Sequence, residues 1–165
     1  MLKMPQTFDH NEWIILSTLV VTYLVIILIP KRFPVHITFL VLAASMVVAK
    51  GTNHILGAPP LDLYDFNDTG EFEVFDFLIW FTYPPFGYFF VYLYDRWNLK
   101  GLRIFFYIVS WTAFAVFFEW LTLKAHVFTY KGWRLEYSIP VYLIVLIGYI
   151  LFFKFIKSYE SKSEI

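Results

Sequence analysis

At residues 102–123 the chain reads LRIFFYIVSWTAFAVFFEWLTL. Most of these side chains are aliphatic or aromatic, and the charged ones are Arg103 at the start and Glu119 near the end. A helix of about 20 mainly apolar residues is long enough to cross the hydrocarbon core of a lipid bilayer. The stretch therefore predicts a transmembrane helix.

Four more stretches of the same kind surround it, and nearly all the charged residues fall in the connections between them. The five predicted spans are residues 13–29, 34–56, 72–94, 102–123 and 138–155. In the third span, Pro84 and Pro85 remove two helical N–H donors and predict a kink near Tyr83. The whole chain, residues 1–165, is expected to form one transmembrane domain, an all-α polytopic helix bundle.

The composition agrees with a membrane environment. Hydrophobic residues make up 59% of the chain and charged residues 16%, whereas a soluble domain carries about 25% charged residues. The net charge is +0, so the chain lacks the basic excess typical of nucleic-acid binding, and no nucleic-acid partner is expected. The absence of cysteine excludes disulfides, thiolate metal sites and thiol redox chemistry.

The orientation follows from the distribution of lysine and arginine, because cytoplasmic connections carry an excess of both. One side of the predicted bundle holds eight of them, namely Lys31, Arg32, Arg96, Lys100, Arg103, Lys154, Lys157 and Lys162. The other side holds five, namely Lys3, Lys50, Lys124, Lys131 and Arg134. We therefore expect the N-terminus outside and the C-terminus in the cytoplasm.

Glu119 is the clearest ionisable residue at membrane depth, where a charged group is costly and marks a candidate site. It is expected about 7 Å below Lys124, which ends the fourth span. Thr122 and His126 follow Glu119 at spacings of three and four. These three side chains therefore share one face of the predicted helix.

Matching polar stripes occur on the second and third spans, at Lys50, Asn53 and His54 and at Asp76, Trp80 and Tyr83. If these faces meet, they form an outer polar cluster of Lys50, Asn53, His54, Asp76, Glu119 and His126. The candidates for catalysis are Glu119, His54 and Asp76. The candidates for binding are Lys50, Asn53, Tyr83, Thr122 and His126.

The outer polar cluster has a structural and a functional interpretation. In the structural one, Glu119 holds helices in register through hydrogen bonds worth about 1 kcal/mol each. In the functional one, a carboxylate and a nearby histidine transfer protons, which suits hydrolysis or acyl transfer on a lipid-like substrate, or proton-coupled passage. Metal binding by histidine and carboxylate is a further alternative. No G-x-S-x-G or H-E-x-x-H motif supports an enzyme.

The connection between the second and third spans contains a pattern typical of a calcium loop. It reads DFNDTGEFEVFD at residues 65–76, with a glycine at the sixth position and oxygen-bearing side chains around it. The candidate ligands are Asp65, Asn67, Thr69, Glu71, Glu73 and Asp76. The last position is Asp where calcium loops carry Glu, and Pro59–Pro60 argues against an entering helix. The alternative is an acidic, solvated loop with a turn at residues 68–70.

The connection at residues 126–137 interleaves aromatic and charged side chains. Its simplest interpretation is an interfacial belt, with Tyr130, Trp133 and Tyr137 at headgroup level and a turn at residues 131–132. A lid over the outer polar cluster is the alternative.

Several short motifs occur together in one order: LYDFND at 63–68, FDF at 75–77, YPPF at 83–86, FEW at 118–120, VFTY at 127–130 and YSIP at 137–140. Through them the chain resembles a family of small multi-spanning membrane proteins of endospore-forming bacteria. The resemblance implies a multi-pass protein of the bacterial cytoplasmic membrane. The family has no assigned activity, so the resemblance implies no catalytic residue.

The sequence favours a non-enzymatic envelope or assembly component that acts through contacts with membrane lipids, protein partners or further copies of itself. The first alternative is a membrane-embedded hydrolase or acyl transferase that uses Glu119 with His54 or Asp76. The second is a small oligomeric channel or carrier. An enzyme requires a cavity that reaches Glu119, whereas a contact protein requires Glu119 to be fully paired, with no pocket beside it.

Overall fold

The computed structural model describes residues 8–66 and 74–163 of the chain. In chain order its elements are α1 (His10–Leu28), α2 (Val35–Gly57), β1 (Tyr64–Phe66), α3 (Val74–Ile79), α4 (Tyr83–Arg96), α5 (Leu102–Lys124), β2 (Phe128–Tyr130) and α6 (Leu135–Ser163).

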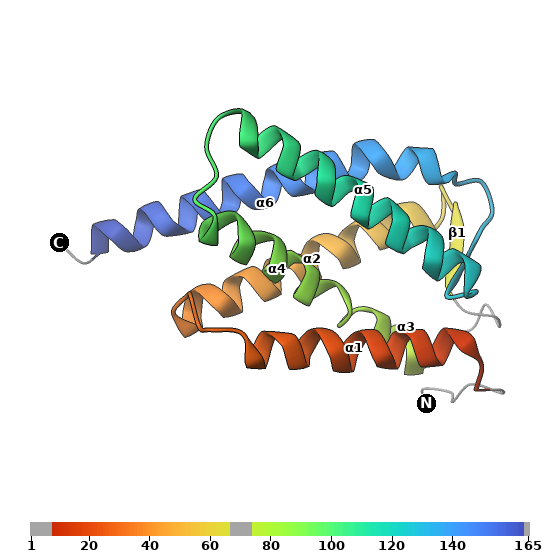
Figure 1. Cartoon of the computed structure of the whole chain (residues 1–165). Helices are drawn as coiled ribbons and strands as arrows, with labels where there is room; N and C mark the ends of the chain where they lie inside the picture. The colour runs from red at the N-terminus through yellow and green to blue at the C-terminus, as the bar shows by residue number, and fades with distance from the viewer. Residues whose placement is uncertain (1–7, 67–73, 164–165) are drawn as a thin grey trace.

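Five helical segments are long and apolar enough to cross a membrane, which confirms the predicted number of spans. They are α1, α2, α3 together with α4, α5 and α6. The segments lie alongside one another, and α1 begins at the end of the bundle opposite to the one where α6 finishes (Figure 1). An odd number of crossings produces this arrangement. Which end faces the cytoplasm stays a prediction.

The predicted bounds differ most at the last helix. α6 begins at Leu135 instead of residue 138 and continues to Ser163 instead of residue 155. Hydropathy marks the part of a helix that fits in lipid, whereas polar residues such as Lys157 and Glu160 continue the same helix beyond it. The helix is therefore longer than the predicted span.

The chain breaks at the proline pair of the third span, as predicted, but more sharply than a kink. α3 ends at Ile79, the backbone turns through residues 80–82, and α4 begins at Tyr83. Pro84 and Pro85 lie in the first turn of α4, where helical N–H groups have no intrahelical partner to lose. Because the helix is interrupted, the predicted stripe of Asp76, Trp80 and Tyr83 on one continuous face is wrong.

α4 lies at the centre of the bundle and packs closely on α2. Tyr88, Phe90 and Val91 of α4 are almost completely buried. Gly87 faces the buried Ser45 of α2 at a separation that leaves no room for a side chain. Small residues at such contacts let two transmembrane backbones approach each other.

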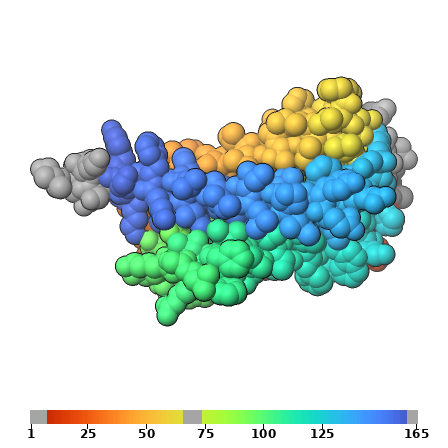
Figure 2. Space-filling model, turned by 90° about the horizontal axis from the view of Figure 1, so that it is seen from above, coloured from red at the N-terminus to blue at the C-terminus, as the bar shows by residue number. Residues whose placement is uncertain are grey.

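α6 lies between α2 and α5 along one face of the molecule (Figure 2). Near the end of α4, Asp95 forms ion pairs with Arg32, which precedes α2, and with Lys157 of α6. These contacts tie three spans together at the end of the bundle opposite to the two strands.

β1 and β2 form a small antiparallel sheet, an element that the all-α prediction did not include. Tyr64 is paired with Tyr130, and Phe66 with Phe128. The backbone N–H groups of residues 131–133 all donate to the carbonyl oxygen of Leu63. The sheet therefore joins the second-to-third connection to the fourth-to-fifth connection at one end of the bundle.

Candidate binding cavity

A cavity of about 240 Å³ lies between the helices at the end of the bundle that carries the sheet. All five spans and both strands contribute to its wall, and the cavity is partly open to the outside. Its inner part is lined mainly by apolar and aromatic side chains, among them Val48, Trp111, Phe114, Val145 and Leu146. Cavities of this kind, between the helices of a bundle, are common places for ligands.

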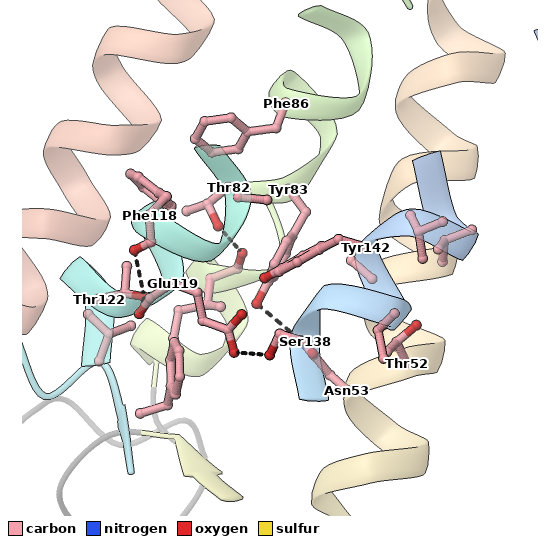
Figure 3. A pocket seen from close by; sticks show the side chains of 18 of the residues that line it. Thr52, Asn53, Thr82, Tyr83, Phe86, Phe118, Glu119, Thr122, Ser138 and Tyr142 are labelled. Carbon is pink, nitrogen blue, oxygen red and sulfur yellow. Dashed lines mark hydrogen bonds between the residues drawn. The ribbon is translucent and has the colours of Figure 1, made fainter. Parts of the chain in front are cut away.

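Glu119 of α5 is the centre of the polar end of this cavity. Its Oε1 atom accepts hydrogen bonds from the Tyr130 hydroxyl at 2.7 Å and from the Ser138 hydroxyl at 2.7 Å. The Trp133 indole nitrogen donates in turn to the Ser138 oxygen at 2.9 Å. Tyr130 of β2 and Ser138 of α6 thus converge on one oxygen of the Glu119 carboxylate, and Figure 3 shows the bond from Ser138.

The second oxygen of this carboxylate, Oε2, is buried and has no hydrogen-bond partner among the described residues. Tyr142 of α6 also approaches Glu119, but it leaves Oε2 without a bond of good geometry. A carboxylate oxygen can accept two hydrogen bonds, and buried polar atoms in proteins are nearly always paired. Oε2 is therefore a vacant acceptor next to the cavity.

A second hydrogen-bonded group lies on the opposite wall and is centred on Asn53 of α2. The Tyr64 hydroxyl donates to its Oδ1 at 3.0 Å, and its Nδ2 donates to the Tyr83 hydroxyl oxygen at 3.2 Å. Because Tyr83 accepts in this pair, its own O–H proton can still be donated. Figure 3 shows Asn53, Tyr83, Tyr142 and Glu119 directed toward the same space.

Glu119 is the one charged side chain among the described residues that line the cavity, and no Lys, Arg or His is included in that lining. Tyr130 lies in β2, outside the spans. Burial raises the pKa of its hydroxyl above the usual range, and the hydrogen bond to Glu119 raises this pKa further. Burial also raises the pKa of Tyr64, with smaller contributions from Tyr83 and Glu119. Both hydroxyls therefore remain protonated donors at neutral pH.

Four of the predicted site residues line the cavity, namely Asn53, Tyr83, Glu119 and Thr122. The Thr122 hydroxyl bonds back to the Glu119 carbonyl oxygen at 2.8 Å. It is therefore engaged with its own helix, and its role in the wall is to fill space.

The structure does not bring the other predicted residues to Glu119. Lys50 lies over the Trp80 ring, 4.0 Å from its centroid, and His54 is exposed. α5 ends at Lys124, so His126 lies beyond the predicted helical face, exposed and with φ 57°. Asp76 is buried in α3 and is not among the described residues that line the cavity. The six-residue outer polar cluster is therefore wrong as a single site.

Sequence reasoning set Ser138 aside because it lacks a G-x-S-x-G setting, missed Tyr142, and assigned Tyr130 and Trp133 to an interfacial belt. The structure instead turns the hydroxyl of Tyr130 and the indole N–H of Trp133 toward the cavity, while Tyr137 is exposed. Val127, Phe128, Tyr130 and Trp133 line the cavity at the end of the bundle that carries the sheet, and a lid role for this segment stays a prediction. The signal in the sequence that could have identified Ser138 is its position as a polar residue at the predicted start of the last span.

Most of the predicted calcium ligands lie outside the described residues, namely Asn67, Thr69, Glu71 and Glu73. Asp65 forms an ion pair with Lys131 at 2.9 Å, and Asp76 belongs to the first turn of α3. Within residues 8–66 and 74–163, no group of three or more His, Cys, Asp or Glu side chains is arranged to hold a metal ion. Calcium binding by the 65–76 loop stays a prediction.

Comparison of the chain with protein-family models, with curated proteins and with solved structures found no match. The resemblance to the family from endospore-forming bacteria stays a prediction.

Proposed function

We propose that the protein binds a single amphipathic, lipid-like molecule inside the membrane. The polar end of the ligand lies at Glu119, and its apolar chain extends between the helices toward Leu146 and Tyr149. The observation that carries this proposal is the continuity of the cavity, which joins an apolar interior to a polar end with a vacant carboxylate oxygen.

The dimensions of the cavity suit a chain-like ligand. Its lining residues run from Ser138 to Tyr149 on α6 and from Trp111 to Thr122 on α5, which is about 16 Å along each helix axis. An apolar cavity of about 150 Å³ is already large enough to hold benzene, and this one is about 240 Å³. The long axis of the cavity follows the helices, so a bound chain lies parallel to the surrounding lipid chains.

This proposal departs from the expectation of a non-enzymatic component that acts through contacts with lipids or partner proteins. A protein that works purely as a structural contact would pair both oxygens of Glu119 in a bundle without a pocket. The vacant Oε2 and the cavity beside it favour a ligand instead. With the predicted orientation, the polar end of the site lies in the outer leaflet of the bacterial cytoplasmic membrane.

A second candidate, hydrolysis or acyl transfer on the same kind of molecule, is favoured by the contact between Ser138 and Glu119. The Ser138 hydroxyl donates to the carboxylate at 2.7 Å, so the carboxylate is placed to take the proton if the serine attacks an ester. His54 and Asp76, the predicted assistants, are not part of this arrangement. Covalent labelling of Ser138 by a lipophilic fluorophosphonate, absent in Ser138→Ala, tests this candidate.

The channel or carrier alternative gains no support from the described residues. The charged lining is confined to Glu119 at one end. Beyond the inner end, the bundle is filled by the buried aromatic core around Tyr88, Phe90 and Phe153. A single copy thus offers no polar route from one end to the other through its described part.

The binding proposal is tested by identifying amphiphiles that remain bound through purification. The protein is purified in a maltoside detergent and denatured, and its organic extract is analysed by mass spectrometry. Ala115 lines the cavity, whereas Ala113 on the same helix is exposed outside it. Ala115→Phe should fill the cavity and remove the bound amphiphile, and Ala113→Phe should retain it. Equal retention by both variants would contradict the proposal.

A further inference from the structure

The polar end of the cavity offers one acceptor that the protein leaves vacant. Tyr130 and Ser138 occupy Oε1 of Glu119, and Oε2 is buried without a partner among the described residues. A ligand that completes this site must therefore donate a hydrogen bond. A ligand head that carries acceptors alone would leave the oxygen unpaired, which costs about 1–3 kcal/mol for a buried polar group.

An ionised Glu119 carboxylate would find no balancing cation in the described wall of the cavity. The lysine and arginine side chains that the structure describes at this end of the bundle are turned elsewhere: Lys131 is paired with Asp62 and Asp65, Lys50 lies over Trp80, and Lys124 and Arg134 are exposed. A carboxylate held away from water is stabilised when a cation pairs with it. The described lining supplies neutral donors and no cation.

Aromatic rings surround the same end of the cavity. They belong to Tyr64, Tyr83, Tyr130, Tyr142, Phe128 and Trp133. Figure 3 shows Tyr83 and Tyr142 on the side of the space that Glu119 faces. A cation near the faces of aromatic rings is attracted to them, and cages of such rings are a known means of holding ammonium groups.

We propose that the head of the bound amphiphile is a protonated primary or secondary amine, which donates a hydrogen bond to Oε2 of Glu119 and lies among these rings. The inference rests on the proposed function and specifies its ligand class. A neutral hydroxyl head can donate to Oε2 but leaves the charge unbalanced. An anionic head is repelled by Glu119 and finds no Lys or Arg among the described lining residues.

The test compares ligands that share one chain and differ in the head. Dodecylamine, dodecan-1-ol and dodecanoate are titrated at neutral pH into the purified full-length protein, and binding is followed by thermal stabilisation and by tryptophan fluorescence, since Trp111 and Trp133 line the cavity. The amine should bind about tenfold or more tightly than the alcohol, and the carboxylate should bind most weakly. Equal affinity for all three would overturn the ammonium head and leave the lipid-binding function intact. Failure of all three to bind would overturn both.

Glu119→Gln gives a second readout, because it preserves the shape of the side chain and removes its charge. The variant should still bind the dodecyl chain but should lose the preference for the amine. Glu136→Gln is the matched control, since Glu136 is exposed near the same end of the bundle and does not line the cavity. It should keep the preference. If Glu119→Gln also keeps the preference for the amine, the proposed contact with Oε2 is wrong. If that variant does not fold, the ligand series on the unmodified protein decides.

The ammonium group has two natural sources, a free long-chain amine and the amino group of an aminophospholipid. Lysophosphatidylethanolamine carries the amino group together with a phosphate, so it is titrated beside dodecylamine. Binding of the amine alone assigns the site to long-chain amines. Comparable binding of both extends it to aminophospholipids, and either result supports the ammonium head.

Discussion

Gly87 of α4 and Ser45 of α2 lie so close together that a Cβ atom on Gly87 would be 2.0 Å from the Ser45 hydroxyl oxygen and 2.9 Å from the Ser45 Cβ. Ser45 is completely buried and donates its own proton to the Val41 carbonyl oxygen at 2.8 Å. The hydroxyl therefore has no space into which it can withdraw. This contact sets the distance between α2 and α4, and both helices contribute to the wall of the cavity.

Gly87→Ala should therefore destabilise the protein by about 1–3 kcal/mol, the usual cost of overpacking a tight interface. Gly148→Ala is the control, because Gly148 lies on the exposed side of α6 with no atom within 4 Å of an added Cβ. The control should be neutral or slightly stabilising, since alanine is the better helix former. Thermal unfolding in detergent measures the stability of both variants. Equal melting temperatures for the two variants would show that α2 and α4 separate easily.

Tyr130→Phe should loosen the sheet end of the bundle. The substitution removes one of the two donors to Glu119 Oε1 and leaves the ring in place, so the expected loss is about 1 kcal/mol. Tyr137→Phe is the matched control, because Tyr137 is 49% exposed and should tolerate the change. Hydrogen exchange of the amides in residues 127–133 should become faster in Tyr130→Phe. Unchanged exchange would mean that Glu119 does not hold this segment.

The same hydroxyl makes stability depend on alkaline pH. The pKa of Tyr130 is raised in the folded protein above its ordinary value of 10.0, by burial first and then by Glu119. Below pH 10 the hydroxyl is protonated in both states, and its contribution to stability is fully present. As the pH rises above 10, the unfolded chain ionises first, so the folded state loses that contribution progressively. Thermal unfolding measured from pH 8 to 11 should show a smaller alkaline decrease in Tyr130→Phe, and parallel curves for the two proteins would contradict this.

The sequence was sufficient for the spans because the crossing of a bilayer depends on local composition. A run such as 102–123 is apolar on nearly every side of the helix, so it predicts a crossing but not which side faces its neighbours. Glu119 stood out as a charge at depth, and Asn53 was found through helical spacing. Tyr83 was named from a stripe that the break between α3 and α4 interrupts, so its position at the cavity does not follow from that spacing. His126 was misplaced because α5 ends two residues before it.

The residues that complete the site depend on contacts between distant parts of the chain. Ser138 and Tyr130 reach Glu119 because α6 packs on α5 and because β2 pairs with β1 across the end of the bundle. Strands of three residues carry too short a pattern of alternation to be recognised in the sequence. Asp76 was misplaced for a related reason: the turn at residues 80–82 separates α3 from α4, and helical spacing cannot be continued across it.

The orientation of the bundle can be measured directly because the chain has no cysteine. Arg134 and Lys100 are exposed residues in connections at opposite ends of the bundle, and each can be replaced by a single cysteine with the same loss of charge. The excess of lysine and arginine on the Lys100 side predicts that this side is cytoplasmic. A membrane-impermeant maleimide should label Arg134→Cys in intact bacterial cells. It should label Lys100→Cys only after the cells have been permeabilised. The reverse pattern would place the polar end of the cavity in the cytoplasmic leaflet, and a ligand would then enter the site from the inner monolayer.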